Sequence, residues 1–315
     1  MKVLVTGAAG FIGSHLCEWL LAQGDDVQGL DAMTDFYDPW RKEQNIRALL
    51  DWDRFSLSRD DLLEAPLDRI LDGVDVVYHL AGQPGVRPSW GEEFGVYLTR
   101  NVLATQRLLE AARQASLWKF VYASSSSVYG NAETLPTVET LRPQPVSPYG
   151  VTKLAAEHLC ELYRENFGLP TASLRFFTVF GPRQRPDMAF SRLVTAALRG
   201  EPFPLYGDGE QTRDFTYVSD IVHALRQAAL SPWCGVANLG GGSRVSMNEV
   251  VDVVSSLAHP VQLDRLPTAK GDVRHTAADT TTARLAFGYR PTTSVAEGLA
   301  AMVAAERAMT EMATS

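Results

Sequence analysis

The chain is poor in the residues that form disulfide frameworks and metal sites. Its 315 residues include three cysteines, Cys17, Cys160 and Cys234, which lie far apart and form no C-x-x-C pair. The six histidines are scattered, and none lies at metal-ligand spacing from another. These absences argue against a disulfide-stabilised domain and against a metal site. We expect Cys17 and Cys160 to be small core residues on amphipathic helices.

The sequence also has no long apolar run and no basic patch. No stretch of about 18 apolar residues could cross a membrane, and no signal-like segment precedes the first predicted strand. The net charge of −8 and the lack of a basic patch argue against nucleic acid as a partner. We therefore expect a soluble, cytoplasmic protein with no membrane partner. The length suffices for one large or two modest domains.

Short β-rich runs alternate with helical patterns through the first 180 residues. This alternation predicts the α/β class, with a Rossmann-type, doubly wound parallel sheet covered by helices on both faces. The helical patterns include residues 97–115 and 149–167, and a late strand near residues 236–239 is expected to return to the sheet. Strands are predicted at residues 2–6, 27–30, 54–58, 74–80, 119–124 and 171–177.

The regular alternation of strand and helix patterns ends near residue 181. Beyond it, prolines and a Gly-Asp-Gly turn at 207–209 interrupt the chain. A strand-like run at 212–218 and several helical patterns indicate a smaller mixed α/β region. We divide the chain into residues 1–180 and 181–315, with no linker between them. The second region is expected to close over the carboxyl edge of the sheet, where open α/β folds bind ligands.

Three glycines near the N-terminus predict a dinucleotide site. Gly7, Gly10 and Gly13 follow a predicted strand, and Phe11 and Ile12 open an apolar helix. The first glycine allows a sharp turn, the second lets a pyrophosphate approach the backbone, and the third lets the helix pack close to the sheet. The N-terminus of the helix offers free N–H groups to the phosphates.

An acidic residue at the end of the second predicted strand indicates which dinucleotide binds. Asp31 lies 18 residues after Gly13. A carboxylate there accepts hydrogen bonds from both ribose hydroxyls and repels a 2′-phosphate, which favours NAD over NADP. Residues 1–180 are therefore predicted to be the NAD-binding domain.

A tyrosine and a lysine are candidates for proton transfer. Tyr149 and Lys153 lie four residues apart at the start of a predicted helix, so they share one face. The Lys153 ammonium, with the positive nicotinamide ring, is expected to lower the pKa of Tyr149 from its usual value near 10. Tyr149 would then remove a proton from a hydroxyl while hydride leaves the same carbon, and Lys153 would bind the nicotinamide ribose.

Four serines at residues 124–127 directly follow an apolar strand, which places them at the carboxyl edge of the sheet. We expect Ser125 to hydrogen-bond the reacting oxygen and to position it against Tyr149. No histidine and acid are placed to activate a serine nucleophile, which argues against a hydrolase triad.

Together these motifs resemble the extended short-chain dehydrogenase/reductases that act on nucleotide sugars. The resemblance includes the Gln-Thr-Arg-Asp-Phe-Thr-Tyr-Val run at 211–218 and extends over nearly the whole chain. It implies a tightly bound NAD that serves as a recycled hydride carrier. Gly82 stands where the family usually has alanine. The resemblance also implies cofactor contacts from Asp61 and Leu62 near the adenine, Leu80, Ala81 and Gly82 along the groove, and Asn101 on the nicotinamide side.

The residues after Ser125 indicate the type of reaction. Family members that dehydrate sugar nucleotides usually carry an Asp-Glu pair there, and those that form UDP-xylose by decarboxylation usually carry a glutamate. This chain has Ser126 and Ser127, so the carboxylates for elimination are missing. Oxidation at C4 followed by reduction from the opposite face needs only Tyr149, Ser125 and NAD, which favours a 4-epimerase.

Three segments, residues 35–39, 85–90 and 178–188, resemble those of UDP-glucuronate 4-epimerases. Epimerases of neutral UDP-hexoses commonly have asparagine where this chain has Thr178. The Thr178 hydroxyl and the Arg185 guanidinium suit a carboxylate at C6. Oxidation of glucuronate at C4 gives a β-keto acid that tends to lose CO₂. We hypothesise that Arg185 and Thr178 hold the carboxylate away from the alignment that favours this loss.

The same resemblance implies the remaining contacts to a UDP-sugar. An arginine that the family often has at position 269 is replaced by Ala269, so either Lys270 or Arg274 is expected to bind phosphate in its place. The other predicted substrate contacts are Ser125, Ser126, Ser127, Arg87, Arg192, Leu205, Tyr206, Arg213 and Asp272.

Other interpretations stay open at this point. The chain could epimerise UDP-glucose or a UDP-N-acetylhexosamine, or decarboxylate a nucleotide sugar through other residues. A more distant alternative is a non-catalytic NAD-sensing protein. The apolar faces of the patterns at 97–115 and 149–167 resemble helices that pair across a two-fold axis in related enzymes, which predicts a homodimer, although core packing gives the same pattern.

Overall fold

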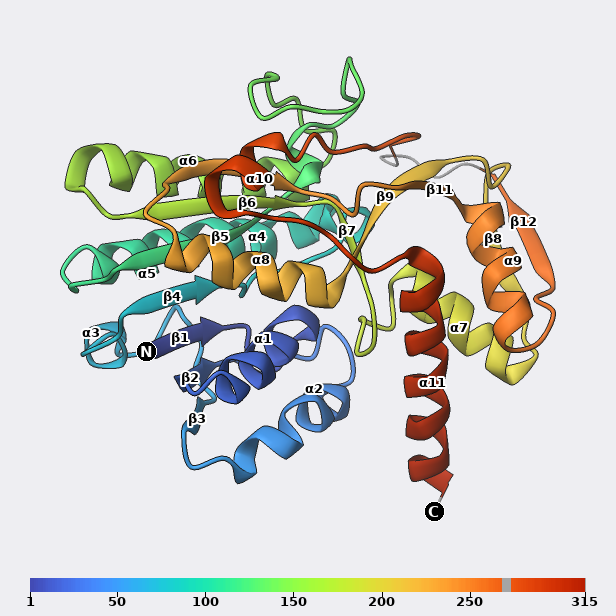
Figure 1. Ribbon diagram of the computed structural model, residues 1–315, viewed down its shortest axis with the longest axis horizontal. Coiled ribbons are helices and arrows are strands. Elements are labelled where there is room, and N and C mark those ends of the chain that lie inside the picture. The colour runs from blue at the N-terminus through green and yellow to red at the C-terminus, as the bar shows by residue number, and fades with distance from the viewer. Residues whose placement is uncertain (268–272, 315) are drawn as a thin grey trace.

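The computed structural model describes residues 1–267 and 273–314. At its centre lies a seven-stranded sheet in which every neighbouring pair of strands is parallel (Figure 1). Its strands are β1 (Lys2–Thr6), β2 (Asp26–Leu30), β3 (Phe55–Ser58), β4 (Val76–His79), β5 (Lys119–Ser125), β6 (Thr171–Phe176) and β10 (Gly235–Leu239). The order β3-β2-β1-β4-β5-β6-β10 reverses direction between β1 and β4, where open sheets form their ligand crevice.

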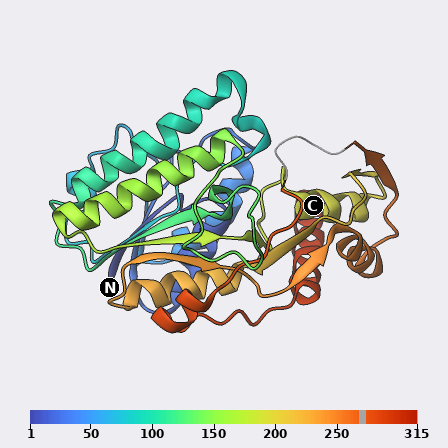
Figure 2. The same cartoon turned by 90° about the horizontal axis from the view of Figure 1, so that it is seen from above.

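Helices cover both faces of this sheet, which confirms the predicted doubly wound Rossmann-type fold. On one face, α1 (Phe11–Ala22), α8 (Val218–Leu230) and α10 (Thr281–Phe287) share a buried core with the strands. On the other face, α3 (Leu67–Ile70), α5 (Ala104–Ala112) and α6 (Pro148–Phe167) share a second core. Figure 2 shows these two layers on opposite sides of the strands.

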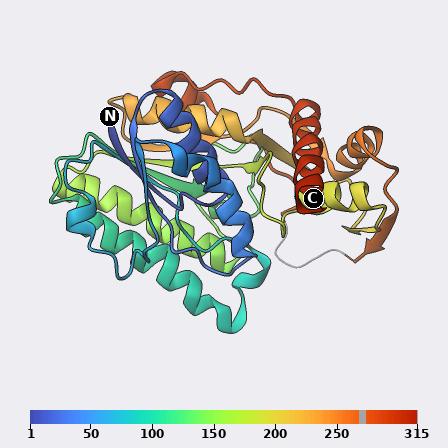
Figure 3. The same ribbon diagram turned by 90° about the horizontal axis from the view of Figure 1, so that it is seen from below.

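A smaller mixed region follows β6 and has its own apolar core. It contains a three-stranded sheet of order β11-β9-β7 and a parallel pair, β12-β8. Figures 1 and 3 show α11 beside α7 and α9, away from the main sheet. The elements are β7 (Thr178–Phe180), α7 (Ala189–Arg199), β8 (Phe203–Tyr206), β9 (Thr212–Tyr217), β11 (Arg244–Ser246), α9 (Met247–Leu257), β12 (Leu263–Leu266) and α11 (Val295–Thr314).

The two regions are interleaved along the chain. After β9 the chain returns to the main sheet, where α8 packs on one face and β10 pairs with β6 from Gly235 to Leu239. α10 also packs on the main sheet, although it lies far beyond residue 181. The main unit therefore takes segments from both halves of the sequence, and the division at residue 180 stays a prediction.

The helical pattern at 97–115 is not one regular helix. It begins as α4 (Phe94–Tyr97), continues as a π-helical segment, η4 (Leu98–Leu103), and ends as α5. Short π-helical segments occur frequently at functional sites, and this one carries Arg100 and Asn101. The remaining short elements are α2 (Pro39–Ile46) and the 3₁₀ turns η1 (Arg47–Asp51), η2 (Arg87–Ser89), η3 (Gly91–Glu93) and η5 (Ser126–Val128).

Helix α6 begins and ends at strong local signals. The Ser147 side chain accepts a hydrogen bond from the Gly150 N–H at 3.1 Å, and Pro148 is the first helical residue. Gly168 ends the helix in the left-handed conformation, with φ of 70°. These signals fix where Tyr149 and Lys153 stand on the first turns. Over the described part of the chain, no helix combines the length and the apolar character needed to cross a membrane.

Candidate active site

The glycine turn after β1 is packed too tightly for any other residue. Gly7 has φ of 72°, which L side chains rarely adopt, and its N–H donates to the Leu30 carbonyl at 2.8 Å. A Cβ added at Gly13 would lie 2.0 Å from the Gly7 carbonyl oxygen, and one at Gly10 would lie 3.1 Å from the same atom. The backbone at the start of α1 therefore has the bare, close-packed form that a pyrophosphate needs.

Asp31 is held rigidly where β2 ends. Its two carboxylate oxygens accept hydrogen bonds from the N–H groups of Ala9, at 3.1 Å, and Met33, at 2.8 Å. Lys42, on α2, places Nζ 3.3 Å from Asp31 Oδ1 and is itself buried. The sequence analysis did not identify Lys42, because nothing in the spacing of α2 indicates that its side chain turns back toward β2.

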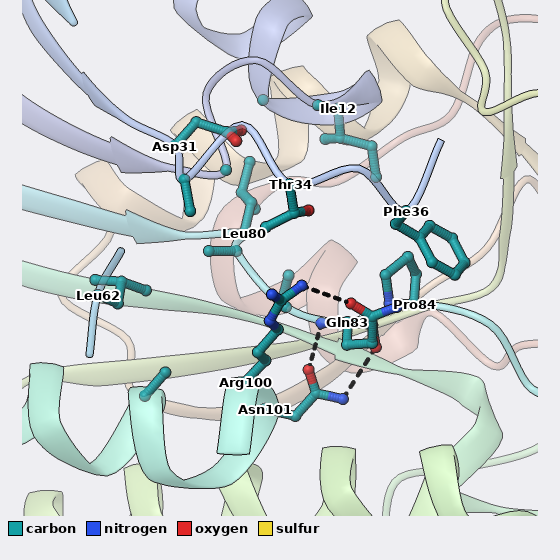
Figure 4. Close-up of a pocket in the computed structure, with 18 of the residues that line it drawn as sticks. Ile12, Asp31, Thr34, Phe36, Leu62, Leu80, Gln83, Pro84, Arg100 and Asn101 are labelled. Atoms are coloured by element: carbon teal, nitrogen blue, oxygen red, sulfur yellow. Dashed lines mark hydrogen bonds between the residues drawn. The ribbon is translucent and has the colours of Figure 1, made fainter. Parts of the chain in front are cut away.

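One cleft of about 260 Å³ runs along the carboxyl edge of the main sheet (Figure 4). Every residue predicted to bind the cofactor lines it. These residues are Gly7, Gly10, Phe11, Ile12, Gly13, Asp31, Asp61, Leu62, Leu80, Ala81, Gly82, Asn101, Tyr149 and Lys153. The glycine turn and the acidic residue that line the cleft fit an extended dinucleotide, and the individual contacts stay predictions.

Asn101 connects neighbouring groups on one wall of the cleft through hydrogen bonds. Its Oδ1 accepts from the Gln83 N–H at 2.6 Å, and its Nδ2 donates to the Gln83 carbonyl and to Thr152 Oγ1, both at 3.0 Å. A Cβ at Gly82 would lie 2.9 Å from Asn101 Oδ1, so glycine at this position lets Asn101 approach. Figure 4 shows Arg100 on the same wall, where its Nη1 donates to Gln83 Oε1 at 3.3 Å.

Several lining residues were not predicted from the sequence. Besides Lys42, Arg100 and Gln83, they are Leu30, Ala32, Thr34, Phe36, Tyr37, Asp60, Pro84, Ala104, Ala123, Ser124 and Phe176. Six of these fourteen residues lie directly next to a predicted residue in sequence, so a wider window around each motif would have included them. Phe36 and Tyr37 lie in the segment 35–39 that resembles UDP-glucuronate 4-epimerases, and they reach the cleft from the loop before α2.

Tyr149 and Ser125 meet at the end of the cleft. The Ser125 side chain lies close enough to Tyr149 to lower the pKa of the phenol, as does the positive charge of Arg185. Burial has the larger effect and raises this pKa above its ordinary value. Helix α6 packs closely on the turn at residues 124–129, which we call the serine turn. A Cβ at Gly150 would lie 2.6 Å from the Ser127 carbonyl oxygen, and this close packing brings Tyr149 and Ser125 together.

The predicted effect of Lys153 on Tyr149 is not what the protein's own side chains produce. The pKa of Tyr149 is raised, and the groups that oppose the increase are Ser125 and Arg185 rather than Lys153. Lys153 lies with Nζ 4.5 Å from the centre of the Tyr122 ring, and burial lowers its pKa to about 8. Within the chain itself, the increase in the pKa of Tyr149 that burial causes is larger than the decrease that the nearby groups cause.

The four serines have different environments. Ser125 Oγ accepts a hydrogen bond from the Ser127 N–H at 3.1 Å, which closes the 3₁₀ turn η5. Ser126 and Ser127 are half-buried on that turn. Ser124 is among the residues that line the cleft, and its hydroxyl donates to Glu157 Oε2 at 2.6 Å. No carboxylate occupies position 126 or 127.

Comparisons with known proteins agree with this geometry. The model of the NAD dependent epimerase/dehydratase family matches residues 3–239. The chain belongs to this family. A Bacillus subtilis protein named as an uncharacterized UDP-glucose epimerase, YtcB, is 46% identical, with 95% of this chain and 96% of that protein covered.

Two solved structures of the epimerase/dehydratase type are similar over nearly their full length. The UDP-glucuronic acid 4-epimerase of Bacillus cereus, in complex with UDP-glucuronic acid and NAD, has 43% identity and a TM-score of 0.95, with 98% of this chain and 100% of that chain covered. MoeE5 in complex with UDP-glucuronic acid and NAD has 46% identity and a TM-score of 0.88, with the same coverage. MoeE5 is also solved with UDP-glucose and NAD.

In this epimerase/dehydratase chain, Arg185 alone among the described substrate residues predicted from the sequence is one of the residues that line the cleft. Its Nε and Nη2 pair with Asp187 at 3.0 and 2.9 Å. Thr178 is half-buried at the start of β7. The Arg87 guanidinium lies 4.3 Å from the centre of the Tyr206 ring, which joins the loop after β4 to the smaller region.

Three other predicted substrate contacts lie on elements of the smaller region. Leu205 is buried in the core of the smaller region, so its backbone rather than its side chain is left to contact a base. Arg192 lies half-buried on α7. Arg213 Nη1 donates to the Arg274 carbonyl at 2.9 Å. Asp272 and Lys270 lie outside the described residues.

Arg274, the other candidate for the missing family arginine, pairs with Asp208 at 2.9 Å on an exposed surface. Within residues 1–267 and 273–314, no group of three or more histidines, cysteines and acidic residues could hold a metal ion.

Proposed function

We propose that this protein is an NAD-dependent UDP-sugar 4-epimerase that interconverts UDP-glucuronate and UDP-galacturonate. The observation that carries the proposal is the proximity of Ser125 to Tyr149, which lines the dinucleotide cleft, with Arg185 close enough to act on the same phenol. A base, a hydroxyl donor and a cation for a sugar carboxylate thus meet at one place. The name of the similar Bacillus cereus structure, a UDP-glucuronic acid 4-epimerase, supports this assignment.

Side chains of the protein itself take up the proton and return it. Tyr149 takes the proton of the C4 hydroxyl and returns it after the sugar ring has turned, while the Ser125 hydroxyl holds the C4 oxygen. When bound in the cleft, NAD would supply reversible hydride transfer at C4, so that hydride removed from one face of the ring could be returned to the other. The glycine turn and Asp31 would hold the cofactor, and Lys153 would add a positive charge near its nicotinamide end.

Arg185 is proposed to bind the C6 carboxylate. An arginine has five N–H donors, and the pair with Asp187 uses two of them, so donors remain for a second carboxylate. A fixed carboxylate keeps the C5–C6 bond out of line with the π orbitals of the C4 carbonyl. The 4-keto intermediate would then survive rotation without loss of CO₂.

A second candidate is epimerisation of a neutral UDP-hexose. MoeE5 has been solved with UDP-glucose as well as with UDP-glucuronic acid, and Arg185 already has an acidic partner in Asp187. Incubation of the pure protein with UDP-glucuronate and with UDP-glucose separately, without added NAD, distinguishes the candidates. We expect NMR to detect UDP-galacturonate. Formation of UDP-galactose alone would replace the first candidate with the second, and a UDP-pentose would indicate a decarboxylase.

We also propose that the protein is a homodimer. Leu98 and Leu103 on the helix that runs through η4, and Val151 and Leu162 on α6, are 47–54% exposed. These helices cover the same face of the sheet, so their apolar side chains can form one self-complementary interface. Light scattering should give twice the monomer mass, and L162E should halve it. L285E, which changes a leucine on α10, is the matched control. The cytoplasmic location stays a prediction.

A further inference from the structure

Behind the Tyr149–Ser125 pair lies a buried ion pair that the proposed reaction does not use. Glu157 on α6 is fully buried, and Arg175 on β6 is 4% exposed. Arg175 Nη2 lies 2.5 Å from Glu157 Oε1, and Nε lies 3.0 Å from Oε2. A buried ion pair contributes little net stability over well-packed apolar residues, because both charges lose their hydration. Its presence here suggests a role other than stabilising the fold.

The ion pair holds both ends of the serine turn. At the start of the turn, Ser124 donates to Glu157 Oε2 at 2.6 Å. At the end of the turn, Tyr129 accepts from Arg175 Nη1 at 2.7 Å and donates to Asn238 Oδ1 on β10, also at 2.7 Å. Ser125 lies directly after the first of these anchors. The position of its hydroxyl therefore depends on the two charged groups beneath it.

We propose that Glu157 and Arg175 are positioning residues for epimerisation. They fix the serine turn that presents Ser125 to Tyr149, and they place a carboxylate one helical turn after Lys153. This inference rests on the proposed function for its effect on turnover, and on the structure alone for its effect on Lys153.

Burial lowers the pKa of Lys153 to about 8, and Cys160 and Glu157 both act in the opposite direction. Because burial raises the pKa of the Cys160 thiol and keeps it neutral, Glu157 is the charged group that favours the charged form of Lys153. His79 is neutral near pH 7 because burial lowers its pKa to about 3, and burial raises the pKa values of Tyr122, Cys160 and Tyr149. The titratable and charged groups around Lys153 are Tyr122 on β5, His79 on β4, Arg175 on β6, and Tyr149, Glu157 and Cys160 on α6.

The chain suits a direct test of this effect, because it contains only five lysines. Lysine labelled with ¹³C at the ε carbon gives a simple spectrum, and K153R assigns the Lys153 signal. In E157Q the midpoint of the Lys153 titration is expected to fall from near 8 by about one pH unit, since an attractive charge is lost. E157Q/R175M, which leaves no unpaired charge, is expected to give a shift in the same direction.

Two further variants separate the parts of the proposal. S124A keeps both charges and removes one anchor of the turn, so it should lower kcat with little change in KM and leave the Lys153 midpoint in place. D25N/R226M removes a control pair away from the serine turn, in which the half-buried Arg226 places Nη1 2.9 Å from Oδ2 of the buried Asp25, just before β2. It should lower thermal stability without changing the Lys153 midpoint or kcat.

The outcomes are distinguishable. If the wild type converts no UDP-sugar, the proposed function fails, while the lysine titration still decides whether the pair controls Lys153. An unchanged midpoint in both E157Q and E157Q/R175M would overturn the electrostatic part of the proposal. An active wild type together with an S124A variant of unchanged kcat would overturn the positioning part.

Discussion

Arg185 and Asp187 form a two-point ion pair at the rim of the cofactor cleft, with Nε and Nη2 of the arginine 3.0 and 2.9 Å from the two carboxylate oxygens. The pair fixes the plane of the guanidinium while leaving other N–H donors available. Because Arg185 also lowers the pKa of Tyr149, it acts on the group that takes up the proton. Its position thus connects recognition of the sugar with the reacting centre.

R185A is expected to raise the KM for UDP-glucuronate about tenfold or more, because a charged hydrogen bond contributes about 1.5–3 kcal/mol. It should also release some UDP-pentose, since the 4-keto acid is no longer held. Product analysis by NMR measures both effects. R183A is the control, because Arg183 pairs with Glu18 at 2.7 Å instead. Unchanged kinetics without pentose would exclude the carboxylate role.

Y149F is expected to lower kcat by about 10²–10⁴-fold, the usual contribution of a general base. NAD content after purification should not change, because the ring stays in place. The control is Y97F, which removes a neighbouring phenol whose hydroxyl donates to the Pro84 carbonyl at 2.8 Å. The role of Tyr149 would be contradicted if the two variants kept similar turnover, measured by product formation over a fixed time.

D31N is expected to weaken NAD binding about tenfold and to permit measurable NADP binding. The neutral amide no longer repels a 2′-phosphate, and Lys42, now 3.3 Å from the carboxylate, becomes available to pair with it. Titration calorimetry with both nucleotides tests the change. D31N/K42M should lose the gain in NADP affinity. If D31N binds no NADP, Lys42 is not the cation that we infer it to be.

His79 is expected to make stability depend on pH between about 3 and 6.5. Its Nδ1 lies 2.8 Å from Thr6 Oγ1 and its Nε2 lies 2.9 Å from Thr105 Oγ1, and burial lowers its pKa from 6.5 to about 3. In this window the unfolded chain binds one more proton than the folded chain, so stability falls as the pH falls below 6.5.

Between pH 7 and pH 5 the expected loss from this single group is about 2 kcal/mol in the free energy of unfolding, measured by urea titration. H79Q should reduce the difference between the two pH values by that amount, although its stability at pH 7 is lower. H259Q, at an exposed histidine, should behave like the wild type. A wild-type difference that H79Q leaves unchanged would assign the effect to other groups.

Much of this protein follows from local sequence patterns. The turn at Gly7, the acidic end of β2, the serines after β5 and the Tyr149–Lys153 spacing are each set by a few neighbouring residues. The alternation of strands and helices then determines a doubly wound sheet, because parallel strands need crossover helices. Parallel strands also bring their carboxyl ends to one edge, which is why predicted cofactor residues from many segments line one cleft.

Other features depend on contacts between segments that only folding brings together. Lys42 turns back to Asp31 and Glu157 lies under Ser124, yet no spacing in the sequence indicates these pairs. The same holds for the raised pKa of Tyr149, which was expected to be lowered. Charge patterns show which groups are present in the chain, whereas packing determines how far each group is removed from water, and that desolvation decides the protonation of the site.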